Sequence, residues 1–417
     1  MIITTFEASM EAIYNTHVFP NGIRLIHHRT KSEVAHFGLL VHTGTRDENP
    51  EEHGLAHFME HMFFKGTGKR SAYQIISRLE DVGGEINAYT TKEETAIFAS
   101  FLKEDYRKAM ELIQDIFLNS RFSEKERKKE AEVILSEIQT YEDSPSELIF
   151  DQAEEFLFPD HPIGRNILGT KESLDRFRNG LVEKFRTDNY ATDELVLCSV
   201  GNISFEQMVK YAGRYFFDLP ARSRIRPREA PMATAKEKHQ VSRNTFQTHC
   251  VISGEAYSYK NNKRLALHLM NNILGGPGMN SRLNMALRER RGYSYSAESH
   301  YLPYTDSGAI NIYFSCDKER FTKSMEVTRG ELKKLRTNLI PEKKLNDARR
   351  QLLGQIAISS ENTENLMLSM AKSFMLFNRV DTLTEISGKL EMITAQHLRD
   401  IANEVLHPDN LNTLIFR

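Results

Sequence analysis

Two halves of this 417-residue chain carry similar sequence patterns in the same order, and this internal repeat constrains the fold more than any other feature. The matching segments are AHFGLLVHTGT with QTHCVISGEAY, GLAHFMEHMFFKG with RLALHLMNNILGG, and SEKERKKEAEVILSEI with PEKKLNDARRQLLGQI. Each match is weak, but the order of the segments agrees, which is typical of a duplicated architecture. We therefore expect two domains of similar fold.

The order of strand-like and helix-like segments indicates the fold class. Apolar runs and alternating patterns predict strands, and longer amphipathic runs predict helices, without βαβ regularity. We therefore expect an α+β fold with two structurally similar domains, each a mainly antiparallel sheet covered by helices. Residues 223–240 contain prolines and several basic residues but little apolar content, which predicts a linker. The domains would then span residues 1–222 and 241–417.

The stretch NPEEHGLAHFMEHMFFKGT, from Asn49 to Thr67, predicts one helix that carries a metal-binding pattern. On a helix, His57 and His61 share a face because they are four residues apart, and Glu60 lies beside them. H-x-x-E-H is the zinc-peptidase pattern in reverse order. In that pattern the histidines bind Zn²⁺, while the glutamate stays off the metal and moves a proton.

A third ligand is needed before the motif can be interpreted as a catalytic zinc site. With 15 histidines and 57 acidic residues, the motif arises by chance in roughly one chain in fifteen of this composition. A second helix is predicted over residues 123–143 by a capping box and an apolar stripe. It carries Glu130 and Glu137 on one face. The residues alone leave open whether these carboxylates serve the metal or are ordinary solvated side chains.

HFMEH, with a glutamate 76 positions after its second histidine, resembles the pitrilysin or insulysin family of metallopeptidases. The similarity is closest to the short branch that includes the mitochondrial processing peptidases and their bacterial relatives. Further segments look like family signatures in family order: GTRDENPEEHGLAHFMEHMFFKGT, GGEINAYTTKEETAIFAS and LRERRGYSYSAES. The resemblance therefore covers most of the chain.

The resemblance implies a role for each residue of the motif. It makes His57, His61 and Glu137 the ligands of one Zn²⁺ per chain. It also makes Glu60 the general base and Glu130 a residue that orients a ligand. The chemistry implied is zinc-dependent hydrolysis of peptide bonds.

Two further segments are implied to bind substrate. In the resembled family, the segment EINAYTTKEETAIFASFL includes an edge strand that binds the substrate backbone by strand addition. By analogy Asn87, Ala88 and Phe98 would contact the substrate, although ordinary strand packing stays open for Ala88 and Phe98. In LRERRGYSYSAES, the resemblance implies that Arg288 and Tyr295 hold the substrate and stabilise the transition state. The alternative is that Arg288 lies on a solvated helix and Tyr295 in a strand.

The C-terminal copy lacks the metal-binding residues. Aligning the glycines that end the two GLAHFMEHMFFKG-like segments pairs each motif residue with a residue that is not a typical zinc ligand. The residues opposite His57, Glu60, His61 and Glu137 are Leu267, Met270, Asn271 and Gln355. The second domain is therefore expected to share the fold without a metal site.

Composition excludes some classes of partner. A net charge of −2 argues against general binding to nucleic acid or membranes. No apolar run has membrane-spanning length, and the N-terminal segment lacks the pattern of a signal peptide. Cys198, Cys250 and Cys316 lie far apart in strand-like runs, so we expect buried reduced thiols. Together these features predict a cytoplasmic protein.

The function expected from the sequence is zinc-dependent endopeptidase activity on peptides or unfolded segments. The resembled family closes a chamber from four such domains, whereas this chain has two, so a partner chain is implied. A homodimer is favoured because one chain carries both the zinc residues and the Arg288 and Tyr295 pair; a heterodimer with a related chain is the alternative. Also open is a non-catalytic or zinc-carrying subunit of a processing peptidase or an assembly complex.

Overall fold

The structure is a computed structural model that describes residues 14–177, 179–243 and 245–417. The expectation that no signal peptide is present falls largely on residues 1–13, which lie outside the described residues. The chain divides into two compact units, each made of three separate segments. The first unit holds the chain up to Val133 together with Lys171–Pro227 and Ala357–Leu383. The second holds Ile134–Thr170, Arg228–Ile356 and Thr384–Arg417.

The first unit contains a six-stranded sheet with the strand order β1-β2-β6-β3-β5-β4. Its strands are β1 (Tyr14–Val18), β2 (Arg24–Arg29), β3 (Val34–Val41), β4 (Glu85–Thr90), β5 (Thr95–Leu102) and β6 (Leu195–Gly201). Only β2 and β6 pair in parallel; the other pairs are antiparallel. β4 is therefore an edge strand with one side of its backbone unpaired within this sheet.

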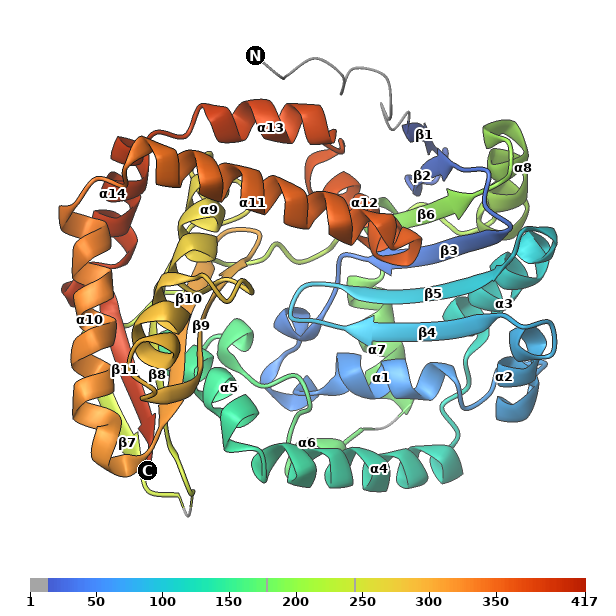
Figure 1. The fold of residues 1–417 in the computed structure, drawn as a ribbon. Coiled ribbons are helices and arrows are strands. Elements are labelled where there is room, and N and C mark those ends of the chain that lie inside the picture. Colours follow the sequence, from blue (N-terminus) through green and yellow to red (C-terminus); the bar gives the residue numbers. More distant parts are fainter. Residues whose placement is uncertain (1–13, 178, 244) are drawn as a thin grey trace. The chain divides into compact units, whose positions relative to one another are not determined.

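Helices flank this sheet in the first unit (Figure 1). They are α1 (Leu55–Phe63), α2 (Ala72–Glu80), α3 (Tyr106–Asn119), α6 (Lys171–Leu174), α7 (Asn179–Asn189), α8 (Phe205–Phe216) and α12 (Thr363–Phe377). The amphipathic helix α2 begins after Ser71, whose side chain accepts a hydrogen bond from the backbone N–H of Gln74 in a capping box. Helix α4 (Glu124–Glu142), also as predicted, starts in the first unit and continues past its boundary.

The second unit contains a five-stranded sheet with the order β7-β11-β8-β10-β9. Its strands are β7 (Lys238–Val241), β8 (Thr248–Glu255), β9 (Ser294–Pro303), β10 (Gly308–Cys316) and β11 (Leu411–Phe416). Its helices are α5 (Pro145–Leu157), α9 (Arg264–Gly275), α10 (Phe321–Thr337), α13 (Leu383–Glu391) and α14 (Ala395–Val405), with α11 (Glu342–Glu361) crossing its boundary. A π-helix covers Asn284–Glu289.

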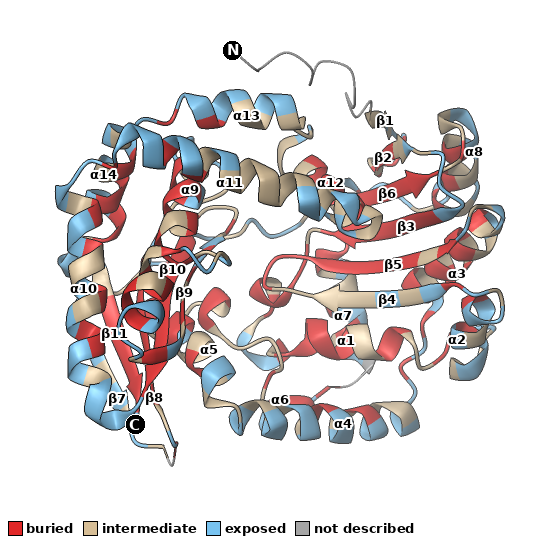
Figure 2. Cartoon of the chain, in the orientation of Figure 1, coloured by how far each residue is buried: buried red, intermediate tan, exposed pale blue. Residues whose placement is uncertain are grey.

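The two sheets repeat one pairing scheme. A parallel pair, β2 with β6 or β7 with β11, is followed by antiparallel strands in the order β3-β5-β4 or β8-β10-β9. Buried residues run along the central strands of both sheets (Figure 2). The predicted fold class, two similar α+β domains with mainly antiparallel sheets, is confirmed.

Each sheet is covered by a helix from the other half of the sequence. Met367, Met370 and Phe374 of α12 pack against Phe98 and other buried residues of the first sheet. Ile149 and Ala153 of α5 pack in the same way against buried residues of the second sheet. The compact units therefore do not coincide with the sequence halves on either side of residues 223–240.

The three cysteines lie in the interior of the protein. Cys198, Cys250 and Cys316 are free thiols and are buried, as predicted. Burial raises the pKa of the Cys198 and Cys250 thiols, which keeps them protonated and unreactive. In the parts of the chain that the structure describes, no helix is both long and apolar enough to cross a membrane.

Candidate metal centre

Helix α1 carries the H-x-x-E-H motif, but it is shorter than the helix predicted from Asn49. A 3₁₀ turn at Pro50–Glu52 is followed by Gly54 in a left-handed conformation, with φ of 87°, and α1 begins at Leu55. The Glu48 carboxylate accepts hydrogen bonds of 2.8 Å from the backbone N–H groups of Gly54 and Ala56. The prediction of one continuous helix was wrong because this buried carboxylate caps a new helix start that glycine makes possible.

His57 lies on the buried side of α1 with only 8% of its surface exposed. Burial, together with the smaller effect of the nearby His61, lowers the pKa of its imidazole to about 4. The ring is therefore neutral at physiological pH, which is the protonation state that binds a metal. The His57 and His61 rings lie edge to face, with centroids 4.6 Å apart.

Helix α4 supplies the third candidate ligand. One potential ligand atom from each of His57, His61 and Glu137 lies within 4.8 Å of the others. In the described residues, no other group of three or more histidine, cysteine, aspartate or glutamate side chains could hold a metal ion in this way. Two imidazoles and one carboxylate form the donor set of many catalytic zinc sites. The residues present therefore fit Zn²⁺.

Glu130 lies on α4, seven residues before Glu137, and contacts the candidate ligand His61. Its Oε1 accepts a hydrogen bond of 2.8 Å from His61 Nδ1, and its Oε2 forms a 2.6 Å ion pair with Lys65. Only 4% of the surface of Glu130 is exposed. With Nδ1 bound in this way, the lone pair of His61 is carried by Nε2. Lys65, which sequence analysis did not identify, balances the charge of this buried carboxylate.

Glu60 lies on α1 between the two histidines and is half-buried. Its charge acts on Tyr190, whose pKa is raised mainly by burial and further by Glu60. A half-buried carboxylate beside a metal-binding pair is suitably located to accept a proton. The geometry thus assembles a potential metal site with a general base next to it.

Comparison with known proteins gives the family. Residues 24–171 match the model of the insulinase family of peptidases, family M16, and residues 180–352 match that of the M16 inactive domain. An uncharacterized zinc protease of Bacillus subtilis (strain 168) is 32% identical over 95% of this chain and 96% of its own length. An uncharacterized zinc protease of Rickettsia bellii is 30% identical over 97% of this chain and 98% of its own length.

The chain belongs to the insulinase family of peptidases, family M16. The fold agrees with solved structures of this kind. A protease from Helicobacter pylori superposes with a TM-score of 0.88 at 18% identity, covering 97% of this chain and 99% of the other. An M16 inactive domain from Pseudomonas fluorescens gives 0.89 at 18% identity, covering 97% and 98%. The family resemblance predicted from the sequence is confirmed.

The counterpart of the motif in this M16 chain is α9, which contains no zinc ligand at the matched positions. Leu267 and Met270 are fully buried in the core of the second unit. Asn271 instead hydrogen-bonds the strand beside it, through Nδ2 to the Ser299 carbonyl at 3.0 Å. In α9 the motif positions therefore serve packing and strand attachment.

The three residues predicted to bind substrate in the first unit lie on paired strands. Asn87 and Ala88 are on the edge strand β4, and Asn87 pairs with Phe98 on β5. Asn87 is exposed, whereas Phe98 is 7% exposed and packs in the core beneath α12. The edge position suits strand addition. Substrate contact stays a prediction for all three, and the side chain of Phe98 has a packing role.

Arg288 and Tyr295 lie in the second unit, on the π-helix and on β9. Both are exposed, Tyr295 by 79%. Tyr295 lines a cavity of about 630 Å³ with polar and aromatic neighbours that include Glu147, His249 and Tyr313. The cavity and the exposure leave both side chains accessible, and their part in catalysis stays a prediction.

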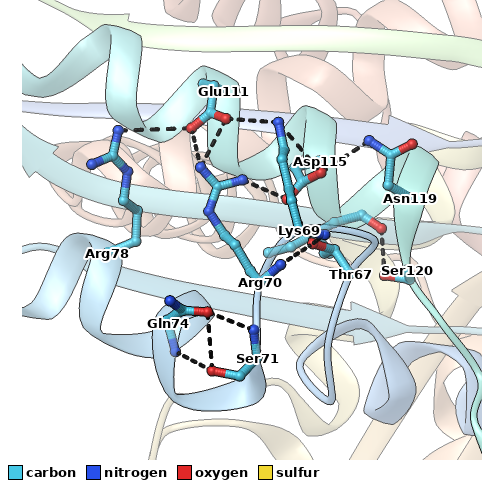
Figure 3. A network of polar contacts seen from close by, with 11 residues as sticks. Thr67, Lys69, Arg70, Ser71, Gln74, Arg78, Glu111, Asp115, Asn119 and Ser120 are labelled. Atoms are coloured by element: carbon cyan, nitrogen blue, oxygen red, sulfur yellow. Dashed lines mark hydrogen bonds and ion pairs between the residues drawn. The ribbon is translucent and has the colours of Figure 1, made fainter.

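A polar network fixes the chain after α1 (Figure 3). Asp115, fully buried on α3, accepts hydrogen bonds from the Thr67 hydroxyl at 2.8 Å and from Arg70 Nη1 at 2.5 Å. Arg70 also pairs with Glu111 at 2.7 Å. Burial raises the pKa of Asp115, but its hydrogen bonds outweigh burial and lower it overall. The network anchors the C-terminal side of the motif to α3.

A second network holds the chain before α1, and sequence analysis did not find it. Arg224, in the predicted linker, pairs with Asp47 at 2.7 Å and Glu194 at 3.3 Å. Glu194 also binds His42 at 2.8 Å. Although Arg224 lies in the segment predicted to be a linker, its side chain is only 13% exposed. A buried arginine in a polar segment carries no local sequence signal.

Proposed function

We propose that this M16 chain is a zinc-dependent endopeptidase that hydrolyses peptides or unfolded segments. The observation that carries this proposal is the convergence of His57, His61 and Glu137 within 4.8 Å. The names of the relatives support zinc as the metal. One Zn²⁺ per chain is the stoichiometry that these three ligands imply.

The metal contributes one element of the chemistry. When bound, Zn²⁺ lowers the pKa of a water molecule to roughly 7 and polarises a carbonyl group. His57 and His61 bind as neutral imidazoles, and the low pKa of His57 favours this state. Glu137 adds one negative charge, so the ligand set leaves the cation a net positive charge that favours a carbonyl oxygen.

Glu60 moves the proton. Its carboxylate accepts a proton from the attacking water as the oxygen bonds to the carbonyl carbon, and it gives that proton to the amine nitrogen as the C–N bond breaks. Such general acid–base catalysis contributes about 10²- to 10⁴-fold to the rate. Glu130 keeps the His61 ring in orientation through its 2.8 Å hydrogen bond, and Lys65 pairs with Glu130 at 2.6 Å.

Substrate binding and assembly extend the proposal. The unpaired side of β4, with Asn87 and Ala88, binds the substrate backbone as an added strand. Arg288 and Tyr295 stabilise the oxyanion, and two copies of the chain close the chamber in a cytoplasmic homodimer. A fully active monomer, found by light scattering of the peak that carries activity, would contradict the dimer.

The experiment that tests this function is cleavage of a mixed library of unstructured peptides by the purified protein. Glu60→Gln is compared with wild type, with Glu142→Gln as a matched control because Glu142 is an exposed carboxylate near the end of α4. Zinc content is measured on all three proteins. We expect wild type and Glu142→Gln to cleave, and Glu60→Gln to keep its zinc while its rate falls about 10²- to 10⁴-fold.

Other outcomes would change the proposal. If Glu60→Gln cleaves as fast as wild type, Glu60 is not the base. If no protein cleaves although each binds zinc, the chain is the zinc-carrying or non-catalytic subunit of a heterodimer, and a related chain should restore activity when added.

A further inference from the structure

A second cavity, of about 250 Å³, lies in the first unit and is separate from the metal-binding residues. It is formed by the end of α3, by α7, by the start of β6 and by the chain that follows α8. Its lining combines an apolar floor with charged residues at the wall and rim. The lining residues include Phe117, Glu183, Arg186, Tyr190, Leu195 and Arg222.

The floor of this cavity is apolar and rigid. The rings of Phe117 and Tyr190 stack with centroids 5.5 Å apart and an interplanar angle of 3°. Phe117 is 4% exposed, Tyr190 8% and Leu195 1%, so the side chains are fixed by packing. A preformed apolar surface of this kind binds an aliphatic or aromatic group with little loss of protein entropy.

One wall of the cavity is the guanidinium of Arg186. Its Nη2 donates to the carbonyls of Phe117 at 3.0 Å and Leu118 at 3.3 Å, which fixes the group at the C-terminal end of α3. Among the residues that the structure describes, no carboxylate lies within ion-pair distance of Arg186. Burial lowers the pKa of Arg186, and the charges of Tyr190 and Glu183 oppose this shift. An anionic group would therefore gain from binding beside it.

The rim carries charges of both signs. Glu183 and Arg222 are exposed lining residues, and Glu183 precedes Arg186 on the same helix by three positions, so the two share a face. The cavity thus offers a positive wall, a rim with one negative and one positive residue, and an apolar floor. A ligand with a carboxylate, an ammonium group and an apolar side chain would match all three features.

We propose that this cavity binds a free α-amino acid with an apolar side chain. The carboxylate pairs with Arg186 and Arg222, the ammonium group pairs with Glu183, and the side chain lies on Phe117, Tyr190 and Leu195. The volume limits the ligand to about the size of one residue, since drug-sized ligands occupy roughly 300–1,000 Å³. The chemical class is the smallest product that peptide hydrolysis can generate.

Calorimetric titration with L-phenylalanine tests the binding without any peptide substrate. N-acetyl-L-phenylalanine removes the ammonium charge and L-phenylalanine amide removes the carboxylate. We expect saturable binding of L-phenylalanine and about tenfold weaker binding of each analogue, since one charge-assisted hydrogen bond is lost. No saturable binding of L-phenylalanine, or equal binding of all three compounds, would overturn the proposal.

Two variants link the binding to the cavity. Glu183→Gln changes an exposed side chain and should reduce affinity about fivefold to tenfold for L-phenylalanine but not for its N-acetyl analogue. Arg186→Lys keeps the charge but loses the fork geometry, and should weaken all carboxylates. Thermal unfolding confirms that each variant is folded. Unchanged affinity in folded Glu183→Gln would place the ligand elsewhere.

Discussion

The two halves of the chain place equivalent helices against equivalent edge strands, but among the described residues only the N-terminal half brings together side chains that could hold a metal ion. In the N-terminal half, α1 packs beside the edge strand β4 and faces α4 with His57, His61 and Glu137. In the C-terminal half, α9 packs beside the edge strand β9 with Leu267 and Asn271 at the matched positions. The sheets follow the same pairing order.

The shared fold alone therefore does not bring together side chains that could hold a metal ion. Leu267 is fully buried, and Asn271 bonds the carbonyl of Ser299, so the copy uses these positions for stability. His57 is almost as buried as Leu267. Burial of its polar ring nitrogens costs free energy of folding, whereas burial of the leucine side chain is favourable. The site therefore depends on a few side chains and on the residues that orient them.

The largest effect is expected for His57→Leu, which gives α1 the residue that α9 has at this position. Loss of one of three ligands should reduce zinc affinity by well over 100-fold and abolish cleavage. The leucine replaces a buried neutral ring, so the fold should be retained. Zinc content measures the loss of the metal, and circular dichroism measures whether the fold is retained. A folded variant with full zinc content would show that His57 is not a ligand.

Glu130→Gln tests the orientation of His61. A glutamine cannot balance Lys65 and accepts a weaker hydrogen bond from the ring, so zinc affinity should fall about 10- to 100-fold. Competition with a chromogenic chelator measures the affinity. Glu142→Gln on the same helix is the control and should bind as wild type. If both variants bind zinc with equal affinity, Glu130 forms a structural ion pair and does not contribute to metal binding.

The pH dependence of stability tests the ion pairs that hold the chain before α1. Burial raises the pKa of Glu194, but the hydrogen bonds and charges of His42 and Arg224 outweigh burial and lower it to about 2 from 4.5. The Glu194 carboxylate therefore binds a proton less readily in the folded state than in the unfolded state. The resulting stability is present above pH 4.5 and is lost as pH falls toward 2.

Glu194→Gln should remove this contribution, on the order of 2 kcal/mol at neutral pH. The free energy of unfolding, measured by denaturant titration between pH 3 and 7, should fall less steeply with acid in the variant than in wild type. Parallel pH profiles for the two proteins would show that Glu194 is not stabilised by these partners.

The smallest effect is expected for Asn271→Ala, the matched change in the copy. Loss of the 3.0 Å hydrogen bond to Ser299 should cost about 1 kcal/mol of unfolding free energy. Zinc content should stay at the wild-type value, because α9 has no part in metal binding. A loss of zinc in a folded Asn271→Ala protein would break the distinction between the two halves.

Much of the fold and site follows from local sequence patterns. The capping box at Ser123 predicts the start of α4, and the spacing of Glu130 and Glu137 places them on one face of that helix. The internal repeat predicts two similar sheets before any strand is paired. The motif identifies both histidines as candidate ligands, because a helix brings residues four apart together without tertiary information.

Other features depend on contacts that no local pattern records. Glu48 breaks the predicted helix only because its buried carboxylate reaches the N–H groups of Gly54 and Ala56. Arg224 binds Asp47 across 177 positions of sequence. Periodicity can predict a helix, but it does not tell which sheet a helix such as α5 or α12 covers.

Anomalous X-ray diffraction at the zinc absorption edge, on crystals grown without chelator, tests the central claim most directly. The account predicts one strong peak per chain, at about 2.0–2.2 Å from nitrogen atoms of His57 and His61 and an oxygen of Glu137. It predicts no peak between α9 and α11. A peak in the C-terminal half, or a peak on α1 that Glu137 does not ligate, would contradict the account.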